Sequence, residues 1–475
     1  MAFLDGSVVN IAIPAIQSQL HATITGIQWV VNGYALMLCS LILISGALGD
    51  RFGRKRIFTY GIGIFVASSF LCSISHGVTQ LILFRALQGI GGAMMIPGSL
   101  SIINASFNES VRGRAIGLWS GFAGGVAALG PFLGGCLVQT FGWQSIFYIN
   151  IPLGLLALFI SITFVPETKN PTSTKIDLIG AILIFLSLLG ITYGLISGPV
   201  TSLIGGIVLF IFFIITQTRV KDPLVPLKIF TSPLVTGANL ATLFLYFALS
   251  GVIFFFVLNL QQVQQYPPVF AGLAMLPAIL LITFLSGPAG GLADKIGPRI
   301  PMVIGPLLVS VGMVLLILPG THANYFLQYL PGLVLFGLGM ALVIAPLTKS
   351  ALAVEQKFSG AASGVNNAVA RVAGLLAVAL LGAIVVSLFT AQLHNKITTS
   401  PLKPSEQQQI LAQSNKLAGI ELPSSFTPQT KAIAQSAIED AFIYAFRWAM
   451  GINALLAFLS AVIAFFTIHN PKKKI

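Results

Sequence analysis

One acidic side chain stands inside a long apolar stretch near the start of the chain. Asp5 is the carboxylate that the sequence places within such a stretch rather than at its edge. Because hydrocarbon surroundings disfavour the charged form of a carboxylate, burial favours the uptake of a proton. A carrier driven by a proton gradient needs a group of this kind. The alternative is that Asp5 caps the first helical turn near the membrane surface.

Arginines within later apolar stretches supply the opposite charge. Arg85 and Arg371 each interrupt an apolar run, where a permanent guanidinium needs an acidic partner, a carbonyl group or water. If Asp5 alternates between a proton and a cationic partner, protonation becomes a switch. The alternative is that Arg85 extends its head outward to the membrane surface, and for Arg447 this is at least as good an explanation as contact with a ligand.

The remaining reactive residues do not form an enzyme or metal site. The three cysteines, Cys39, Cys72 and Cys136, lack metal-ligand spacing and are expected to pack as small residues. The five histidines fall in or beside loops without clustering with acids (His21, His76, His322, His394 and His469). The nucleotide-binding pattern G-x-x-x-x-G-K-[ST] does not occur, which excludes an ATP-driven pump of that type, and no selectivity element of a channel is visible. We therefore expect a protein with no catalytic residue, metal or cofactor, driven by a gradient.

The elements that position these residues are apolar helices. Of 475 residues, 56% are apolar and 8% are charged, too few charges for a water-soluble surface of this size. A run of about 20 apolar residues can cross a membrane, and the runs predict an all-α integral membrane protein. We predict fourteen transmembrane helices, at 1–20, 28–48, 57–75, 80–104, 114–138, 143–165, 177–197, 199–217, 234–256, 269–291, 301–318, 325–346, 362–388 and 441–468.

The basic residues test this topology. Most of the 25 Lys and Arg residues fall in every second loop, and the short loops on the other face contain none. The positive-inside rule then places both termini in the cytoplasm and the chain in the cytoplasmic (inner) membrane. The formal net charge of +13 therefore reflects topology and not a nucleic-acid partner. Because Asp5 follows Met1 so closely, we expect a start upstream of Met1, and we expect no cleavable signal peptide.

An internal repeat divides the chain into halves. Residues 46–55 (GALGDRFGRK) return at 290–299 (GGLADKIGPR), each time after the second helix of a set of six. We predict an N-terminal six-helix bundle (1–165), a linker (166–233) that carries a transmembrane hairpin (177–217), a C-terminal six-helix bundle (234–468) that includes an external loop (389–440), and a basic cytoplasmic tail (469–475). Repeated halves of this kind rock about a central site in transporters.

The repeated loop is a candidate conformational latch. Asp50 can meet arginines or helix N-termini of the neighbouring bundle, and the glycines permit a tight reversal and close helix approach. The alternative is an ordinary basic turn. The latch set comprises Gly46, Gly49, Asp50, Arg51, Gly53 and Arg54, with Asp294 and Gly297 in the second copy. A second small-residue set predicts a tight, bent helix contact: Gly121, Gly125, Gly130, Pro131, Gly134 and Gly135.

Together these stretches resemble the major facilitator superfamily, whose hallmark loop is G-x-L-x-D-[RK]-x-G-x-[RK]-[RK]. Three further stretches, at 4–14, 85–89 and 121–135, are similar to the 14-helix drug:proton antiporter branch (EmrB/QacA-like), as is 143–152. The resemblance covers essentially the whole chain. It implies export of drugs or small amphiphiles by alternating access, with Asp5 and Arg85 in proton coupling and the Gly-Pro element at 130–131 as the antiporter motif. A symporter or facilitator of the same fold that imports a metabolite stays open.

Further polar and aromatic residues could line the route of the cargo, although aromatic side chains near helix ends are more often membrane-surface anchors. The candidates are Trp29, Asn32, Tyr34, Gln88, Asn239, Tyr246 and Arg371. Asp5, Arg85 and Arg371 offer no pair of carboxylates for dicationic drugs, so we favour neutral, weakly acidic or zwitterionic cargo. The external loop 389–440 could form a cap or bind a partner; a periplasmic adaptor is conceivable by resemblance alone.

Overall fold

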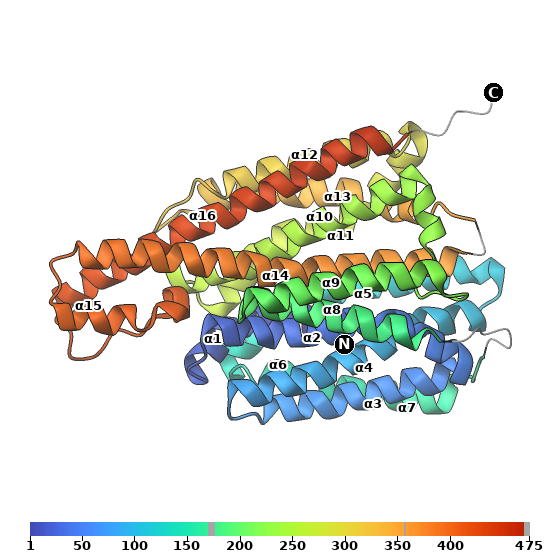
Figure 1. The fold of residues 1–475 in the computed structure, drawn as a ribbon, viewed down its shortest axis with the longest axis horizontal. Helices are drawn as coiled ribbons and strands as arrows, with labels where there is room; N and C mark the ends of the chain where they lie inside the picture. Colours follow the sequence, from blue (N-terminus) through green and yellow to red (C-terminus); the bar gives the residue numbers. More distant parts are fainter. Residues whose placement is uncertain (170–175, 356–357, 470–475) are drawn as a thin grey trace.

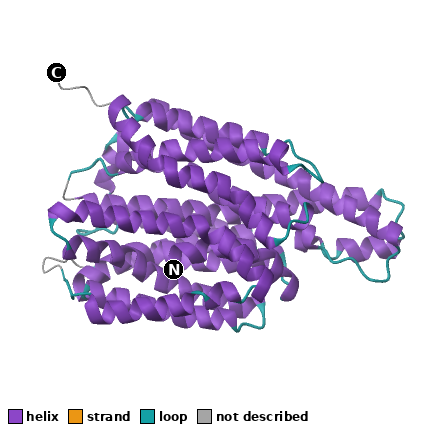
Figure 2. Cartoon of the chain, turned by 180° about the vertical axis from the view of Figure 1, so that it is seen from behind, coloured by secondary structure: helices purple, strands orange, loops and turns teal. Residues whose placement is uncertain are grey.

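The computed structural model describes residues 1–169, 176–355 and 358–469, apart from some side chains, most of them between 104 and 128. Within these ranges every regular element is a helix, as Figure 2 shows. Eleven of the described helices are long and apolar enough to cross a membrane. The prediction of an all-α protein with many membrane-spanning helices is confirmed.

The N-terminal helices pack into one group. They are α1 (Ala2–Gln19), α2 (Ile24–Phe52), α3 (Arg54–Ser73), α4 (Val78–Ser106), α5 (Glu109–Phe141), α6 (Ser145–Tyr148) and α7 (Asn150–Phe164). Helix α4 packs against α2 and α3, while α1 packs against α5. The short α6 runs directly into α7, and the two form one apolar span. These helices lie along one side of the molecule in Figure 1.

The C-terminal helices form the opposite side in Figure 1. They are α10 (Pro233–Leu258), α11 (Pro268–Ile296), α12 (Arg299–Leu315), α13 (Leu330–Ala351), α14 (Ser359–Thr398) and α16 (Pro428–Thr467). A π-helical turn, Asn259–Val263, continues α10, and another, Tyr325–Tyr329, leads into α13. Helix α16 packs against α10, α12 and α14.

A helical hairpin lies between the two groups. Its arms are α8 (Leu178–Ile196) and α9 (Val200–Arg219), and the backbones of Gly190 and Gly206 touch where the arms meet. Helix α8 packs on both α2 and α14, so the hairpin contacts each group, as Figure 1 also shows. Asp177 caps α8 through the backbone N–H of Gly180 and accepts a second hydrogen bond from Gln217 at 2.7 Å.

Two helices are longer than the sequence predicts, because apolar side chains continue at helical spacing into the polar segment. Helix α14 extends to Thr398 instead of residue 388, and α16 begins at Pro428 instead of residue 441. The buried side chains of Leu393, Ile397 and Ile438 carry the core beyond the apolar runs. The predicted boundaries at these two ends are therefore wrong by about ten residues or more.

The segment between the two long helices completes these extensions. Helix α15 (Pro404–Leu411) and a 3₁₀ turn (Ser414–Gly419) connect α14 to α16, and Lys396 pairs with Asp440 at 2.6 Å across the two long helices. Leu417 and Phe426 are buried in the same hydrophobic cluster as the transmembrane core. The segment is a folded projection of the helical body, at the end marked by α15 in Figure 1.

The two groups touch where α5 meets α11. A side chain at Gly272 would collide with the carbonyl group of Pro131, and one at Gly135 would meet the backbone of Pro268 and Val269. On the other face of α5, Gly134 lies against the backbone of Val8 in α1. The small residues thus allow one bent helix to approach both α1 and α11 backbone to backbone.

This contact yields a matched test within α11. Gly272→Leu is expected to separate α11 from α5 and to abolish most transport, because no side-chain rotation can relieve a clash with backbone; overpacking of this kind typically costs about 1–3 kcal/mol. Gly287→Leu is the control, since a Cβ at Gly287 meets no atom within 4 Å. Thermal unfolding midpoints and transport rates of the two variants would check this. Equal behaviour would contradict the role of the close contact.

Candidate functional site

Asp5 and Arg85 form an ion pair inside the N-terminal group. Arg85 Nη1 of α4 donates to Asp5 Oδ2 of α1 at 2.5 Å. The exposed fractions of these residues are only 2% and 1%. Asp5 does not cap its helix, because α1 has no side-chain cap hydrogen bond. Arg85 does not extend to the membrane surface, since its guanidinium is held at Asp5.

Two amides hold the other oxygen of the carboxylate. Gln88 Nε2 donates to Asp5 Oδ1 at 2.9 Å, and Asn150 Nδ2 donates to the same atom at 3.1 Å. Arg85 and Gln88 are one helical turn apart on α4, so both point toward α1. Asn150 is the first residue of α7. Asp5 therefore joins three helices.

A further layer of contacts holds the ligands of the carboxylate. Gln88 also donates to Ser69 Oγ of α3 at 2.8 Å, and Arg85 Nε donates to the carbonyl group of Val30 in α2 at 3.3 Å. The Arg85 guanidinium lies 4.4 Å from the centre of the Tyr34 ring and 5.7 Å from that of Phe147. Aromatic faces stabilise a cation that has lost its water.

The backbone of α4 explains how Arg85 reaches this place. Gly89 lies so close to the Tyr34 carbonyl group that a side chain there would clash, and Gly92 lies against the Tyr34 ring. These two glycines let α4 approach α2 closely. Tyr34 therefore covers the guanidinium instead of facing solvent, and its hydroxyl group points to the Ala2 carbonyl oxygen at 3.5 Å.

The titratable group of this cluster is the Asp5 carboxylate. The cluster holds one carboxylate, one guanidinium and neutral amides, and in the described part of the chain no three His, Cys, Asp or Glu residues gather to hold a metal ion. A proton on Asp5 would leave Arg85 without its counter-ion. Breaking a buried pair in this way is energetically large, so the protonation state of Asp5 must change how α1 and α4 interact.

Arg371 lies where the two groups of helices face each other. Its guanidinium is 5.4 Å from the centre of the Phe3 ring of α1, and Phe3 in turn packs edge-on against Trp119. Arg371 and Tyr246 are both half-buried, on α14 and α10. Asn239 lies deeper in the C-terminal group, where it accepts a hydrogen bond from Asn366 at 3.2 Å.

Two other candidates point toward neighbouring helices. Trp29 donates to Ser197 Oγ at 2.7 Å and packs on Tyr193, so it contacts the end of α8. Asn32 is fully buried, and its amide atoms have no hydrogen-bond partner among the described residues. Their role in lining the route of the cargo stays a prediction.

Both copies of the repeated loop pair their acid within their own half. Asp50 accepts from Arg54 at 2.7 Å, and Asp294 from Lys349 at 2.5 Å. Gly53 and Gly297 take the positive φ angles +123° and +87° that favour glycine. Among the other latch residues, Arg51 lies against the ring of Phe52, and Gly46 lies beside Pro97 and Gly49 beside Arg54.

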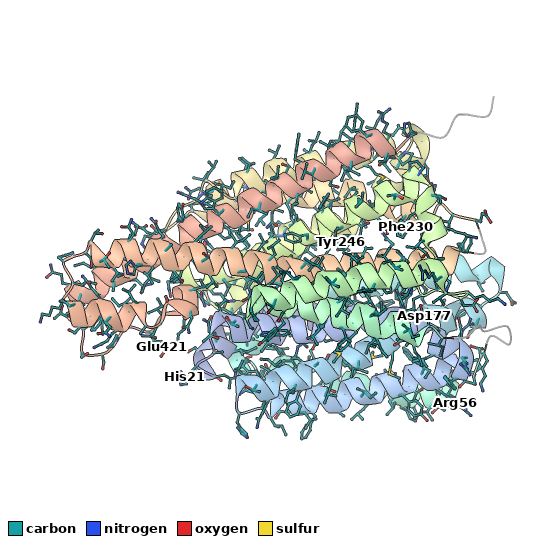
Figure 3. The ribbon with its side chains drawn as sticks, viewed as in Figure 1. His21, Arg56, Asp177, Phe230, Tyr246 and Glu421 are labelled. Carbon is teal, nitrogen blue, oxygen red and sulfur yellow. The ribbon has the colours of Figure 1, made fainter. Side chains whose placement is uncertain are left out.

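Sequence reasoning missed Glu167 at this end of the molecule. Its carboxylate accepts from the backbone N–H groups of Lys55 and Arg56 and so caps the start of α3. Figure 3 marks Arg56 and Asp177 at this end, opposite His21 and Glu421. An acid directly after the last apolar residues of α7 is the only local signal, and it fits any loop.

The motif in α5 is described only in part. Gly130 lies against Ser7, Gly134 against Val8, and Pro131 and Gly135 against α11. A side chain at Gly125 would meet nothing within 4 Å. The surroundings of Gly121 lie outside the described residues.

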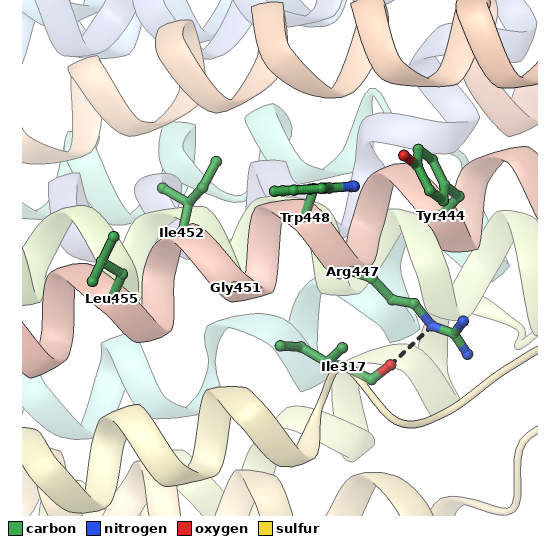
Figure 4. Close-up of a pocket in the computed structure, with 7 residues that line it drawn as sticks. All are labelled: Ile317, Tyr444, Arg447, Trp448, Gly451, Ile452 and Leu455. Atoms are coloured by element: carbon green, nitrogen blue, oxygen red, sulfur yellow. Dashed lines mark hydrogen bonds between the residues drawn. The ribbon is translucent and has the colours of Figure 1, made fainter.

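Arg447 is engaged by its own chain. Its Nε donates to the Ile317 carbonyl group at 3.0 Å, and it reaches the carbonyl groups of Leu318 and Pro319 beyond the end of α12. It lines a groove of about 570 Å³ together with Trp448, as Figure 4 shows. No residue of the Asp5 cluster lines this groove, and Arg447 there satisfies carbonyl groups beyond the end of α12.

The comparisons with known proteins identify the family. The family model described as "Major Facilitator Superfamily" matches residues 1–378. The chain belongs to this superfamily. It is 32% identical over 426 residues to the multidrug resistance protein Stp of Mycobacterium tuberculosis (strain CDC 1551 / Oshkosh), covering 87% of this chain and 78% of that protein. It is 30% identical to the tetracenomycin C resistance and export protein of Streptomyces glaucescens, covering 98% and 89%.

Solved structures of transporters have a similar fold. A bacterial homologue of the human lysosomal transporter Spinster, in an inward-facing and unoccupied conformation, matches with a TM-score of 0.68 at 16% identity, covering 99% of this chain and 96% of that one. A D-xylose–proton symporter matches with a TM-score of 0.61 at 14% identity, covering 100% and 98%. At these identities the likeness shows the fold alone.

The ion pair predicts a pH-dependent loss of stability. Arg85→Ala leaves the Asp5 carboxylate buried without a counter-ion, which is expected to lower the free energy of unfolding by about 3–5 kcal/mol at neutral pH. The loss should shrink as the pH falls, because protonation removes the unpaired charge. The double variant Asp5→Asn/Arg85→Ala carries neither charge and should show no such recovery. Thermal unfolding over a pH series would measure both, and a deficit that ignores pH would contradict the pairing.

Proposed function

We propose that this chain is a proton-coupled antiporter that exports drugs or other small amphiphiles across the cytoplasmic membrane by alternating access. The observation that carries the proposal is the buried pair of Asp5 and Arg85. Resistance and export in the names of the relatives support outward transport over the import of a metabolite. The gradient supplies the energy, and the proposal needs no cofactor.

The proton acts through the tie between helices. When Asp5 is charged, it binds Arg85, Gln88 and Asn150 and so holds α1 to α4 and α7. When it is protonated, the attraction to Arg85 is lost, and the free energy needed to move α1 relative to α4 falls. Proton binding from outside and release inside would thus drive the helices between two arrangements.

Cargo is expected to bind where Arg371 faces Phe3. Helix α1 carries both Phe3 and Asp5, so contact with cargo and the charge of Asp5 act on the same helix. The aromatic rings suit flat apolar groups. Asp5 is already engaged by three donors, so it offers no free carboxylate to a cationic drug. This supports neutral, weakly acidic or zwitterionic amphiphiles as the substrate class.

Hydrogen bonds between the groups support an inward-facing state. Gln261 at the end of α10 donates to the Ile11 carbonyl group at 3.0 Å, and Gln262 donates to Gln17 at 2.9 Å. Gln17 donates in turn to the carbonyl group of Lys416 in the external segment. These bonds close the external end, while Asp50 and Asp294 each pair within their own half. In the opposite state we expect Asp50 to engage the other half.

The membrane topology is part of the proposal. We propose fourteen spans, which add α1, α5 and α12 to the eleven spans that are long and apolar enough to cross a membrane. The even number and the basic loops support two cytoplasmic termini. The segment with α15 would then lie outside the membrane on the external face.

Efflux measurements test the proposal directly. In cells that lack other pumps, the wild-type chain is expected to lower accumulation of a substrate dye and raise resistance to at least one antibiotic. Asp5→Asn should reduce concentrative export to the background level, because its amide binds no proton at neutral pH, and a protonophore should do the same to the wild type. Arg85→Ala should also be inactive.

Export that persists without the Asp5 carboxylate would contradict the proposal. If Asp5→Asn still exports and the protonophore has no effect, proton coupling at Asp5 is excluded. Asn10→Leu is a control on the same helix, since the Asn10 amide donates only to the carbonyl group of Gly6 one turn away. It should export as the wild type does.

The latch has its own prediction. The pair of Asp50 and Arg54 is partly exposed, and such pairs add roughly 0–1 kcal/mol to stability. Asp50→Asn should therefore leave the unfolding midpoint almost unchanged while slowing transport several-fold, since the pairing in the opposite state is lost. Asp222→Asn, in the cytoplasmic linker, is the control. Transport by Asp50→Asn at the wild-type rate would show that the loop is an ordinary turn.

A further inference from the structure

The two amides that touch Asp5 differ in what they can still do. Gln88 uses every part of its amide: Nε2 donates to Asp5 Oδ1 and to Ser69, and Oε1 accepts from Arg85 at 2.5 Å. Turning the Gln88 amide over would break all three hydrogen bonds at once. Its orientation is therefore fixed, and it can only donate to Asp5.

Asn150 is only half used. Its Nδ2 donates to Asp5 Oδ1 at 3.1 Å, but its Oδ1 has no hydrogen-bond partner among the described residues. The residue is fully buried, at 0% exposed, so water does not satisfy this oxygen from outside. A buried acceptor without a donor is unfavourable and calls for an explanation. Rotation about the last side-chain bond would exchange the positions of Nδ2 and Oδ1.

Among the hydrogen-bond partners of Asp5 in the described part of the chain, the Asn150 Oδ1 atom is the acceptor that has no donor of its own. Its Oδ2 faces Arg85, which only donates, and its Oδ1 faces the fixed N–H of Gln88 and the amide of Asn150. Among the described residues, Tyr34, Cys72 and the Met1 amino group also feel the charge of Asp5. The Tyr34 hydroxyl group is already directed at Ala2, and Cys72 belongs to α3.

We propose that Asn150 is a positioning residue that follows the protonation of Asp5, donating to the charged carboxylate and accepting from the protonated one through its unpartnered Oδ1. The inference rests on the proposed function, because it needs Asp5 to bind a proton. The proton comes from water and stays on Asp5 Oδ1, and the new O–H donates to Asn150 Oδ1 once the amide has turned. No other bond forms or breaks. Asn150 thereby keeps α7 tied to α1 in both states, while Arg85 is held in only one.

Infrared difference spectra of the reconstituted protein, taken between high and low pH, test this assignment. The wild type should show a protonated carboxyl C=O band that is lost in Asp5→Asn. In Asn150→Leu the band should remain and move to higher frequency, because the O–H has lost its acceptor. In Asn150→Ser, whose hydroxyl group both donates and accepts, the band should stay near the wild-type frequency. Asn367→Leu is the control, since that amide donates only to the Ser363 carbonyl group.

Transport supplies a second readout. Asn150→Leu should transport roughly tenfold more slowly, as expected for losing a hydrogen bond to a charged group, and Asn150→Ser should recover most of the rate. An Asp5 band at the wild-type frequency in Asn150→Leu would overturn the role of Asn150 and leave the proton site intact. The absence of any Asp5 band in the wild type would overturn both the role of Asn150 and the proposed function.

Discussion

The architecture around the N-terminal helices depends on one charge being taken out of water. A buried carboxylate is tolerated only if cations and donors surround it, and the donors to Asp5 fix two helices: Arg85 and Gln88 fix α4, and Asn150 fixes α7. The glycines at 89 and 92 then serve this cluster, because α4 must approach α2 closely to bring Arg85 into place. Packing and charge are therefore not separate features here.

The two halves share the backbone of the repeated loop but differ in where their charged residues lie. Both copies of the loop motif have a glycine with positive φ and an acid paired inside its own half. The buried ion pair occurs on the N-terminal side, whereas the C-terminal side places Arg371 toward the boundary. Phe3 and Asp5 lie on opposite faces of α1, so the proposed function gives one helix that responds both to the proton and to the cargo.

Much of this could be predicted from the sequence because a membrane makes the rules strict. The lengths of the apolar runs predicted the helices. An acid and an arginine that are each isolated in an apolar run predicted an ion pair, and Asp5 and Arg85 form one. The sequence did not predict two features, the ends of two helices and the role of Asn150. At the end of α14 and the start of α16, apolar residues alternate with polar ones, and no long apolar run marks the helix. Asn150 was missed because an amide two residues before a proline looks like a helix start, and only the fold brings it to Asp5.

The hairpin of α8 and α9 also covers one of the places where the two groups of helices meet. It lies over the line where α2 and α14 meet, with Leu188 packed among Leu36, Cys39 and Leu375. A molecule dissolved in the bilayer therefore meets the hairpin before it reaches the contact between α2 and α14. On the other flank the two groups meet by direct backbone contact of α5 with α11, so the added helices shield one of the two junctions between the groups.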